Sequence, residues 1–185
     1  VDLDNIVKFM KKDFKKSSSV TYPFLNDNDF SLFKLKYQMA LMTVKGKFLE
    51  LSDYYDKNKE ITPIEHMKSR IKKNDEIIRK LISKDRTISV ENIEKYVNDF
   101  AGFRVVCSFV SDLEFLKEYI RNDTDFKILD EKDYLTKPKE SGYRGYHFLV
   151  GVPVYTLEGV EYVKVEIQLR TVAMEMWASL EEKIG

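Results

Sequence analysis

Residues 146–169, YHFLVGVPVYTLEGVEYVKVEIQL, decide the fold of this chain. Two runs rich in β-branched and aromatic residues flank a short segment that ends in glycine, which is the pattern of two strands joined in a hairpin. We therefore predict strands over 146–155 and 160–169, with the turn at 157–159. Along the second strand, an apolar face alternates with a polar face: Val163, Val165, Ile167 and Leu169 oppose Lys164, Glu166, Gln168 and Arg170.

Three further strands are predicted ahead of this hairpin. Phe103–Phe109, FRVVCSF, fits a strand that is buried on both faces. Phe126–Leu129 fits a short strand, and the polar stretch Asp130–Ser141 that follows fits a loop. From Ile64 the residues alternate again, and a strand there places basic or ionisable side chains on one face: His66, Lys68, Arg70 and Lys72.

Helical periodicity predicts the remaining elements. A long helix after Asp29 has one apolar stripe for packing on the core: Phe33, Tyr37, Ala40, Leu41, Val44, Phe48, Leu51 and Tyr55. A shorter pattern of the same kind precedes it: Leu3, Ile6, Val7, Met10 and Phe14. Asn74, Ser111 and Thr171 are expected to cap three later helices, Ser111 in a capping box with Glu114. The last helix is expected to carry its apolar residues on one side: Ala173, Met176, Trp177, Leu180 and Ile184.

The order of these elements, helices first and then strands with covering helices, predicts an α+β fold. We expect a mixed β-sheet of about five strands flanked by helices, with further helices at the N-terminus. Residues 1–60 are predicted to form an N-terminal helical arm and residues 61–185 the core, the two making one structural domain.

Composition excludes several classes of protein. Hydrophobic residues make up 43% of the 185 residues, which is enough for a packed core and excludes wholesale disorder. No apolar run approaches the roughly 20 residues of a membrane span. Lys and Arg number 31, as do Asp and Glu, so coating of nucleic acid through bulk charge is not indicated. The single cysteine, Cys107, fits a small core residue in a reducing cytoplasm.

Two carboxylates are candidates for a metal site. Asp99 precedes the buried strand, and Glu166 lies on the polar face of the last strand. Taken alone, Asp99 also fits a turn residue, and Glu166 also fits an ordinary ion pair on a solvated face. Carboxylates at the ends of neighbouring strands can hold Mg²⁺ together with waters and phosphate. Zinc is disfavoured, because neither carboxylate has histidines near it in the sequence.

Two further features indicate an anion site. The segment from His66 to Arg86 holds eight Lys or Arg residues and three Asp or Glu residues, a net charge of +5. The loop SGYRGYH, residues 141–147, has two glycines that let the backbone approach a ligand, and Tyr143 offers an exposed flat face to a base. Tyr143 and His147 also fit ordinary core positions. Taken together, these features predict a pocket for two polyphosphates and a divalent metal.

Several segments resemble, in order and in spacing, the RelA/SpoT synthetase domain. They are 70–72 (RIK), 99–104 (DFAGFR), 132–134 (KDY), 138–147 (PKESGYRGYH) and 165–171 (VEIQLRT). The segments 63–66 (PIEH) and 177–181 (WASLE) resemble more narrowly the small alarmone synthetases of the RelQ type. The resemblance covers about residues 60–184 and implies a nucleotidyltransferase-like synthetase, without the hydrolase domain of the long members.

The resemblance implies pyrophosphate transfer, in which ATP gives its β- and γ-phosphates as a unit to the 3′-hydroxyl of GDP or GTP. It implies that Asp99 and Glu166 bind Mg²⁺ and that Glu166 is also the base for the 3′-hydroxyl. Implied ATP-binding residues, with the two arginines around adenine, are Arg70, Lys72, Lys80 and Arg104. Implied GDP- or GTP-binding residues, with the tyrosine stacked on guanine, are Lys132, Lys139, Tyr143, His147, Gln168 and Glu175.

Two positions depart from the family pattern. Glu76 stands where serine is common, and Glu175 stands where relatives often carry asparagine or another polar residue near guanine. Relatives form tetramers, so the resemblance implies a homo-oligomer, with no membrane partner and no indicated RNA partner. Two alternatives stay open: a relative that pyrophosphorylates tRNA 3′ ends or adenine nucleotides, and a non-catalytic nucleotide- or RNA-binding module.

Overall fold

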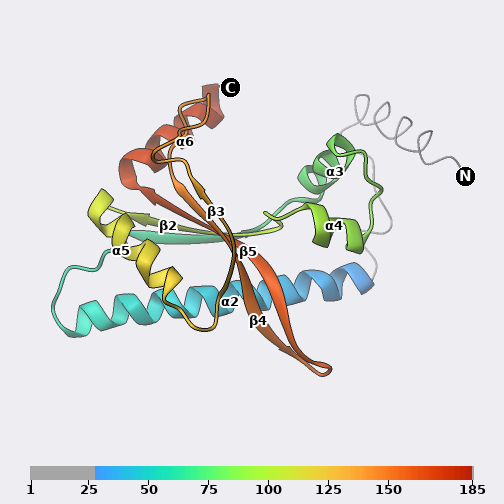
Figure 1. Ribbon diagram of the computed structural model, residues 1–185, viewed down its shortest axis with the longest axis horizontal. Helices are drawn as coiled ribbons and strands as arrows, with labels where there is room; N and C mark the ends of the chain where they lie inside the picture. The colour runs from blue at the N-terminus through green and yellow to red at the C-terminus, as the bar shows by residue number, and fades with distance from the viewer. Residues whose placement is uncertain (1–27, 185) are drawn as a thin grey trace, which may run out of the picture.

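The computed structural model describes residues 28–184 (Figure 1). In chain order the elements are α2 (Asn28–Lys57), β1 (His66–Ile71), α3 (Asn74–Ser83), α4 (Val90–Tyr96), β2 (Ala101–Cys107), α5 (Val110–Arg121), β3 (Lys127–Asp133), β4 (Tyr146–Thr156), β5 (Gly159–Thr171) and α6 (Val172–Ile184). The helix predicted over Leu3–Phe14 lies outside the described residues.

One mixed sheet organises the described part of the chain. Its five strands follow the order β1-β2-β5-β4-β3, so that the decisive hairpin supplies the central strand β5 and its neighbour β4. Strands β2 and β5 run parallel, and the other neighbouring pairs run antiparallel. The predicted α+β fold is therefore confirmed.

Helices α2 and α5 pack on the apolar face of the sheet (Figure 1). The stripe predicted for α2 is buried from Phe33 to Leu51, and the Phe48 ring stacks on Phe103 of β2 with 5.5 Å between centroids. Burial of each such side chain contributes about 1.5–3 kcal/mol to the free energy of folding, so packing on this face of the sheet stabilises the fold. Helix α2 shares one hydrophobic core with the strands. The division of the chain into residues 1–60 and 61–185 stays a prediction.

Helix starts differ from the sequence prediction at two places. Helix α3 is capped at Lys73 rather than at Asn74, because the Glu76 carboxylate accepts the Lys73 backbone N–H at 3.2 Å. Helix α5 begins one residue before Ser111, and Asp112 rather than Glu114 accepts the backbone N–H that caps it. In both helices a carboxylate in the first turn replaces the expected cap side chain.

Strand β3 differs more strongly from prediction, and helix α6 leaves its apolar side uncovered. Strand β3 continues to Asp133, into the predicted loop, since residues 130–133 pair with β4 at an exposed edge where polar side chains are tolerated. Thr171 accepts a backbone hydrogen bond at the start of α6, as predicted. The apolar side of α6 is exposed, with Trp177 54% and Met176 64% accessible. Ala178 is the buried α6 residue instead.

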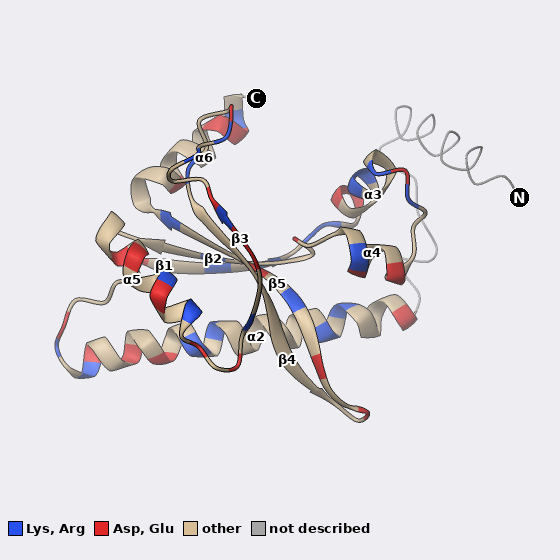
Figure 2. Ribbon diagram, viewed as in Figure 1, with Lys and Arg blue, Asp and Glu red and all other residues tan. Residues whose placement is uncertain are grey.

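Acidic and basic positions are interspersed along α2, α4 and α5, in keeping with the net charge of zero (Figure 2). Among the described helices, none is long and apolar enough to cross a bilayer. The polar face of the sheet, opposite α2 and α5, is not covered by these two helices.

Candidate active site

Strand register lines up a row of polar residues across the open face of the sheet. Arg104 of β2 lies between Lys68 of β1 and Gln168 of β5. Gln168 is also opposite His147 of β4, which in turn lies opposite Lys132 of β3. The fold thus places four predicted site residues, from segments far apart in the chain, on one line.

Two adjoining pockets open on this face. The first, of about 250 Å³, is lined by predicted ATP-site and metal-site residues and is called the donor pocket: Arg70, Asp99, Arg104 and Glu166. The second is lined by predicted GDP- or GTP-site residues and is called the acceptor pocket: Lys139, Tyr143 and His147. Gln168 and Arg170 line both pockets. The two predicted groups of residues therefore meet along strand β5.

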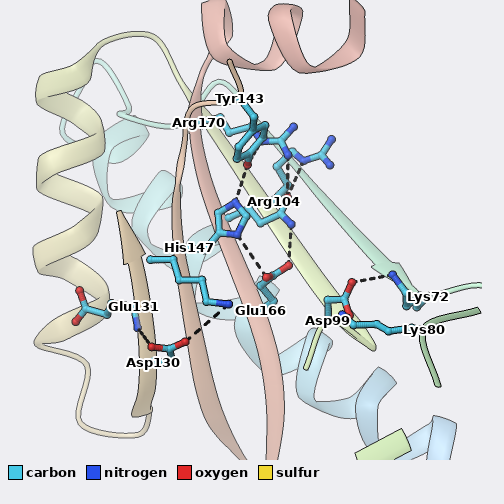
Figure 3. Close-up of polar contacts among 12 residues, drawn as sticks. Lys72, Lys80, Asp99, Arg104, Asp130, Glu131, Tyr143, His147, Glu166 and Arg170 are labelled. Atoms are coloured by element: carbon cyan, nitrogen blue, oxygen red, sulfur yellow. Dashed lines mark hydrogen bonds and ion pairs between the residues drawn. The ribbon is translucent and has the colours of Figure 1, made fainter. Parts of the chain in front are cut away.

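Asp99 is held by two lysines at the donor pocket (Figure 3). Lys72 Nζ donates to Oδ2 at 2.7 Å, and Lys80 Nζ donates to Oδ1. Burial raises the pKa of Asp99, but the hydrogen bonds and charges of the two lysines outweigh burial and lower the pKa to about 2. Asp99 is therefore ionised at neutral pH, and both lysines are fixed beside the donor pocket.

Glu166 lies at the centre of a hydrogen-bonded network (Figure 3). Gln168 donates to its Oε2 at 2.8 Å, and Nδ1 of His147 lies 3.4 Å from its Oε1. Nε2 of His147 is 2.6 Å from Tyr143 Oη, which accepts from Arg170 at 3.0 Å. A neutral His147 that donates from Nδ1 to Glu166 accepts the Tyr143 hydroxyl hydrogen at Nε2. Burial raises the pKa of Glu166, but the contacts with His147 and Gln168 lower it further than burial raises it.

The Tyr143 ring is buried, so the expectation that it exposes a flat face is wrong. The residue is only 7% exposed. The Arg170 guanidinium and Lys139 Nζ lie 4.7 and 4.8 Å from its ring centroid. Tyr134 completes the cluster, 5.9 Å from the Tyr143 ring and 5.1 Å from the His147 ring. The ring that the resemblance implies for stacking on guanine is therefore already in contact with two cations.

The two glycines of the loop 141–147 allow close packing within the protein, rather than leaving an exposed backbone surface for a ligand. Gly142 has a φ of +83°, and a Cβ there would lie 3.3 Å from Nε1 of Trp177. A Cβ on Gly145 would lie 2.9 Å from Tyr143 Oη. Both positions therefore favour glycine in the loop that lines the acceptor pocket.

Replacing Gly142 with alanine is expected to lower the free energy of unfolding by about 1–2 kcal/mol, because the left-handed backbone is strained for any residue with a Cβ. Thermal unfolding of the purified chain measures the change. Gly46→Ala is the matched control: Gly46 is helical in α2 with no atom within 4 Å of an added Cβ, and alanine there should raise stability by about 0.5–1 kcal/mol. Equal shifts in the two variants, or a gain of stability in Gly142→Ala, would contradict the role given to Gly142.

Glu175, in the first turn of α6, contacts two arginines rather than standing free. Arg104 Nη1 donates to its Oε1 and Arg170 Nη1 donates to its Oε2, each at 2.8 Å. Arg170 is 6% exposed and was not among the predicted binding residues. The sequence feature that could have indicated Arg170 is the alternation along the strand, which places it on the polar face with Glu166 and Gln168.

Two further predicted residues contact carboxylates of their own. Arg70 Nη2 is 3.3 Å from a carboxylate oxygen of Glu76, so the residue that replaces the common serine forms an ion pair with a predicted ATP-binding residue. Lys132, at the end of the row on β3, has a half-exposed side chain whose Nζ is 4.0 Å from Asp130. The roles assigned to these and the other predicted site residues stay predictions.

The arrangement defines a class of protein before any comparison is made. Two adjoining polar pockets with arginines, lysines and two ionised carboxylates suit an enzyme that brings two phosphorylated nucleotides together. Within residues 28–184, no cluster of three or more His, Cys, Asp or Glu residues can hold a metal by itself. A metal at Asp99 and Glu166 would therefore take its other ligands from water and substrate.

Comparison with known proteins identifies the family. Residues 69–185 match the family described as a region found in RelA / SpoT proteins, and the chain belongs to this family. It is 41% identical over 150 residues to the GTP pyrophosphokinase YwaC of Bacillus subtilis, covering 81% of this chain and 71% of the relative. It is 35% identical over 161 residues to the GTP pyrophosphokinase YjbM of the same organism, covering 87% and 75%.

A solved structure agrees with the sequence relatives. The small alarmone synthetase 1 of Bacillus subtilis bound to its product pppGpp superposes with a TM-score of 0.79 and 35% identity. The match covers 85% of this chain and 81% of that chain. The resemblance expected from the sequence motifs is therefore confirmed.

Proposed function

We infer that this protein is a (p)ppGpp synthetase, which transfers the β,γ-pyrophosphate of ATP to the 3′-hydroxyl of GDP or GTP and releases AMP. The observation that carries this inference is the meeting of the donor and acceptor pockets at Gln168 and Arg170, with Asp99 and Glu166 both lining the donor pocket. The relatives named GTP pyrophosphokinase, and the related synthetase bound to pppGpp, support the same reaction.

The proposed reaction needs one bond to form and one to break. The 3′-oxygen of the acceptor attacks the β-phosphorus of ATP, the bond from that phosphorus to the α,β-bridging oxygen breaks, and AMP leaves with the electron pair. Glu166 accepts the proton of the 3′-hydroxyl, and His147 and Gln168 hold the carboxylate in place. Arg70 and Arg104 orient the adenine, and Lys72 and Lys80 neutralise donor phosphates once they exchange Asp99 for them.

We propose Mg²⁺ as the cofactor. Asp99 and Glu166 suit it because both are ionised oxygen ligands on one pocket, and Mg²⁺ is commonly bound by one or two carboxylates plus substrate phosphates. When bound there, the ion would neutralise phosphate charge and acidify the attacking hydroxyl. Titration of the protein with Mg²⁺ in the presence of a non-hydrolysable ATP analogue tests this assignment.

A panel of acceptors tests the proposed function. The protein is incubated with ATP, Mg²⁺ and one of GDP, GTP, ADP or tRNA, and AMP is measured. We expect AMP release with GDP or GTP far above the other acceptors. A preference for tRNA or ADP would assign the chain to the alternative pyrophosphokinases, and nucleotide binding without AMP would make it a binding module.

We also propose that the protein acts in the cytoplasm, where its nucleotide substrates are, and as a homo-oligomer. The exposed apolar side chains of α6 support self-association, because contiguous exposed apolar surface is uncommon on monomers: Met176, Trp177, Leu180 and Ile184. Light scattering of the purified protein gives its mass in solution, and a mass of 21.9 kDa, that of the monomer, would contradict the homo-oligomer.

A further inference from the structure

Glu175 bridges residues of the two pockets with a single carboxylate. One oxygen accepts from Arg104, which lines the donor pocket, and the other accepts from Arg170, which lines both pockets. Both bonds are 2.8 Å long, the length of charge-assisted hydrogen bonds. The bridge connects strand β2, strand β5 and helix α6.

Gln168 closes this bridge into a ring. Its Oε1 accepts from Arg104 Nε at 3.4 Å and from Arg170 Nη2 at 3.2 Å, so the two arginines are held at two points each. The other end of Gln168 donates to Glu166. Arg170 also donates to Tyr143 Oη in the acceptor pocket (Figure 3). A shift of either arginine therefore changes contacts in both pockets.

The charges favour a fixed bridge. The Glu175 side chain is 20% exposed, and those of Arg104 and Arg170 are 24% and 7% exposed. Burial raises the pKa of Glu175, but the hydrogen bond from Arg170 and the charge of Arg104 outweigh burial and lower it. The carboxylate is ionised at neutral pH, and each guanidinium is oriented by a charged partner and an amide.

We propose that Glu175 is a positioning residue that couples the donor and acceptor pockets by holding Arg104 and Arg170 in one arrangement. The inference rests on the proposed function, because it requires a nucleotide in each pocket. A nucleotide that fixes Arg170 from the acceptor side also fixes Glu175 and, through it, Arg104. Binding in one pocket then favours binding in the other.

This role differs from the one implied by family resemblance, in which the residue at this position lies near guanine. A carboxylate that read the guanine N1–H and 2-amino group would have to do so with its remaining lone pairs, since each oxygen already accepts from an arginine. The two roles give different results when the 2-amino group is removed from the acceptor, because inosine diphosphate lacks that group.

Calorimetric titration of the whole chain tests the proposal. An α,β-methylene analogue of ATP is titrated into the protein in the presence of Mg²⁺, with and without saturating GDP. The same titration is repeated for three variants. For the wild type we expect GDP to tighten analogue binding by about fivefold or more. In Glu175→Gln, which lacks the charge, and Glu175→Asp, which is too short to reach both arginines, the effect of GDP should fall to within about twofold.

The matched control is Glu118→Gln, which removes a 2.7 Å contact between a glutamate and Arg121 away from both pockets and should keep wild-type coupling. Discrimination between GDP and inosine diphosphate should be unchanged in Glu175→Gln. Wild-type coupling in both Glu175 variants, no coupling in the wild type, or loss of that discrimination would overturn the proposal. The titration needs no turnover, so absence of AMP release would refute the proposed function separately.

Discussion

Replacing Glu166 with glutamine is expected to lower the rate of AMP release by about 10²-fold or more. Glutamine keeps the shape of the side chain but loses the charge that accepts the 3′-hydroxyl proton and binds a cation. The N–H of His147 would then face a neutral amide instead of a carboxylate. Initial rates at saturating ATP and GDP measure the effect as a loss of kcat.

Glu161→Gln is the matched control, because Glu161 lies on the same strand and contacts Lys36 at 2.7 Å outside both pockets. It should keep a near-normal rate. A Glu166→Gln variant that turns over at a similar rate would show that another group accepts the proton.

Replacing Asp99 with asparagine is expected to lower AMP release by a similar factor of about 10² or more. The variant removes the negative charge proposed to bind Mg²⁺ and leaves Lys72 and Lys80 without their common carboxylate partner. Because both lysines then keep their charge for donor phosphates, the loss should appear in kcat more than in the affinity for ATP. Steady-state kinetics at several Mg²⁺ concentrations separate the two quantities.

The control for this variant is Asp123→Asn, in which another partly buried aspartate loses its charge beside Lys47, a contact of 2.7 Å. Its activity should stay near normal, since it lies away from the two nucleotide pockets. If Asp99→Asn turned over as fast as that control, Asp99 would be a structural partner of the lysines alone.

The fold was predictable where burial imposes a period on the sequence. The alternation along residues 163–170 predicted both faces of β5, and the stripe of α2 predicted the helix that covers one of them. The predicted strand ended too early, at Leu129, because an edge strand can carry Asp130, Glu131 and Lys132 without an apolar face. The exposure of Trp177 was not predictable, since an apolar stripe does not say whether a partner covers it.

The types of residue at the site were predictable, but their partners were not. Polar side chains opposite an apolar face pointed to Glu166 and Gln168, and the motifs of the resemblance added the rest. The contact between Arg104 and Glu175 joins residues 71 positions apart, and sequence spacing carries no information about such pairs. The burial of Tyr143 likewise depends on Arg170 and Lys139 covering its ring, which only the folded chain brings about.

The most direct test of the central claim follows both transferred phosphates at once. ATP labelled at its β- and γ-phosphates is incubated with the protein, Mg²⁺ and GDP, and every product is separated and counted. We expect one AMP for each guanosine product, with both labelled phosphates on its 3′ position. Formation of ADP with a single transferred phosphate, or of labelled free pyrophosphate without a guanosine product, would contradict the central claim.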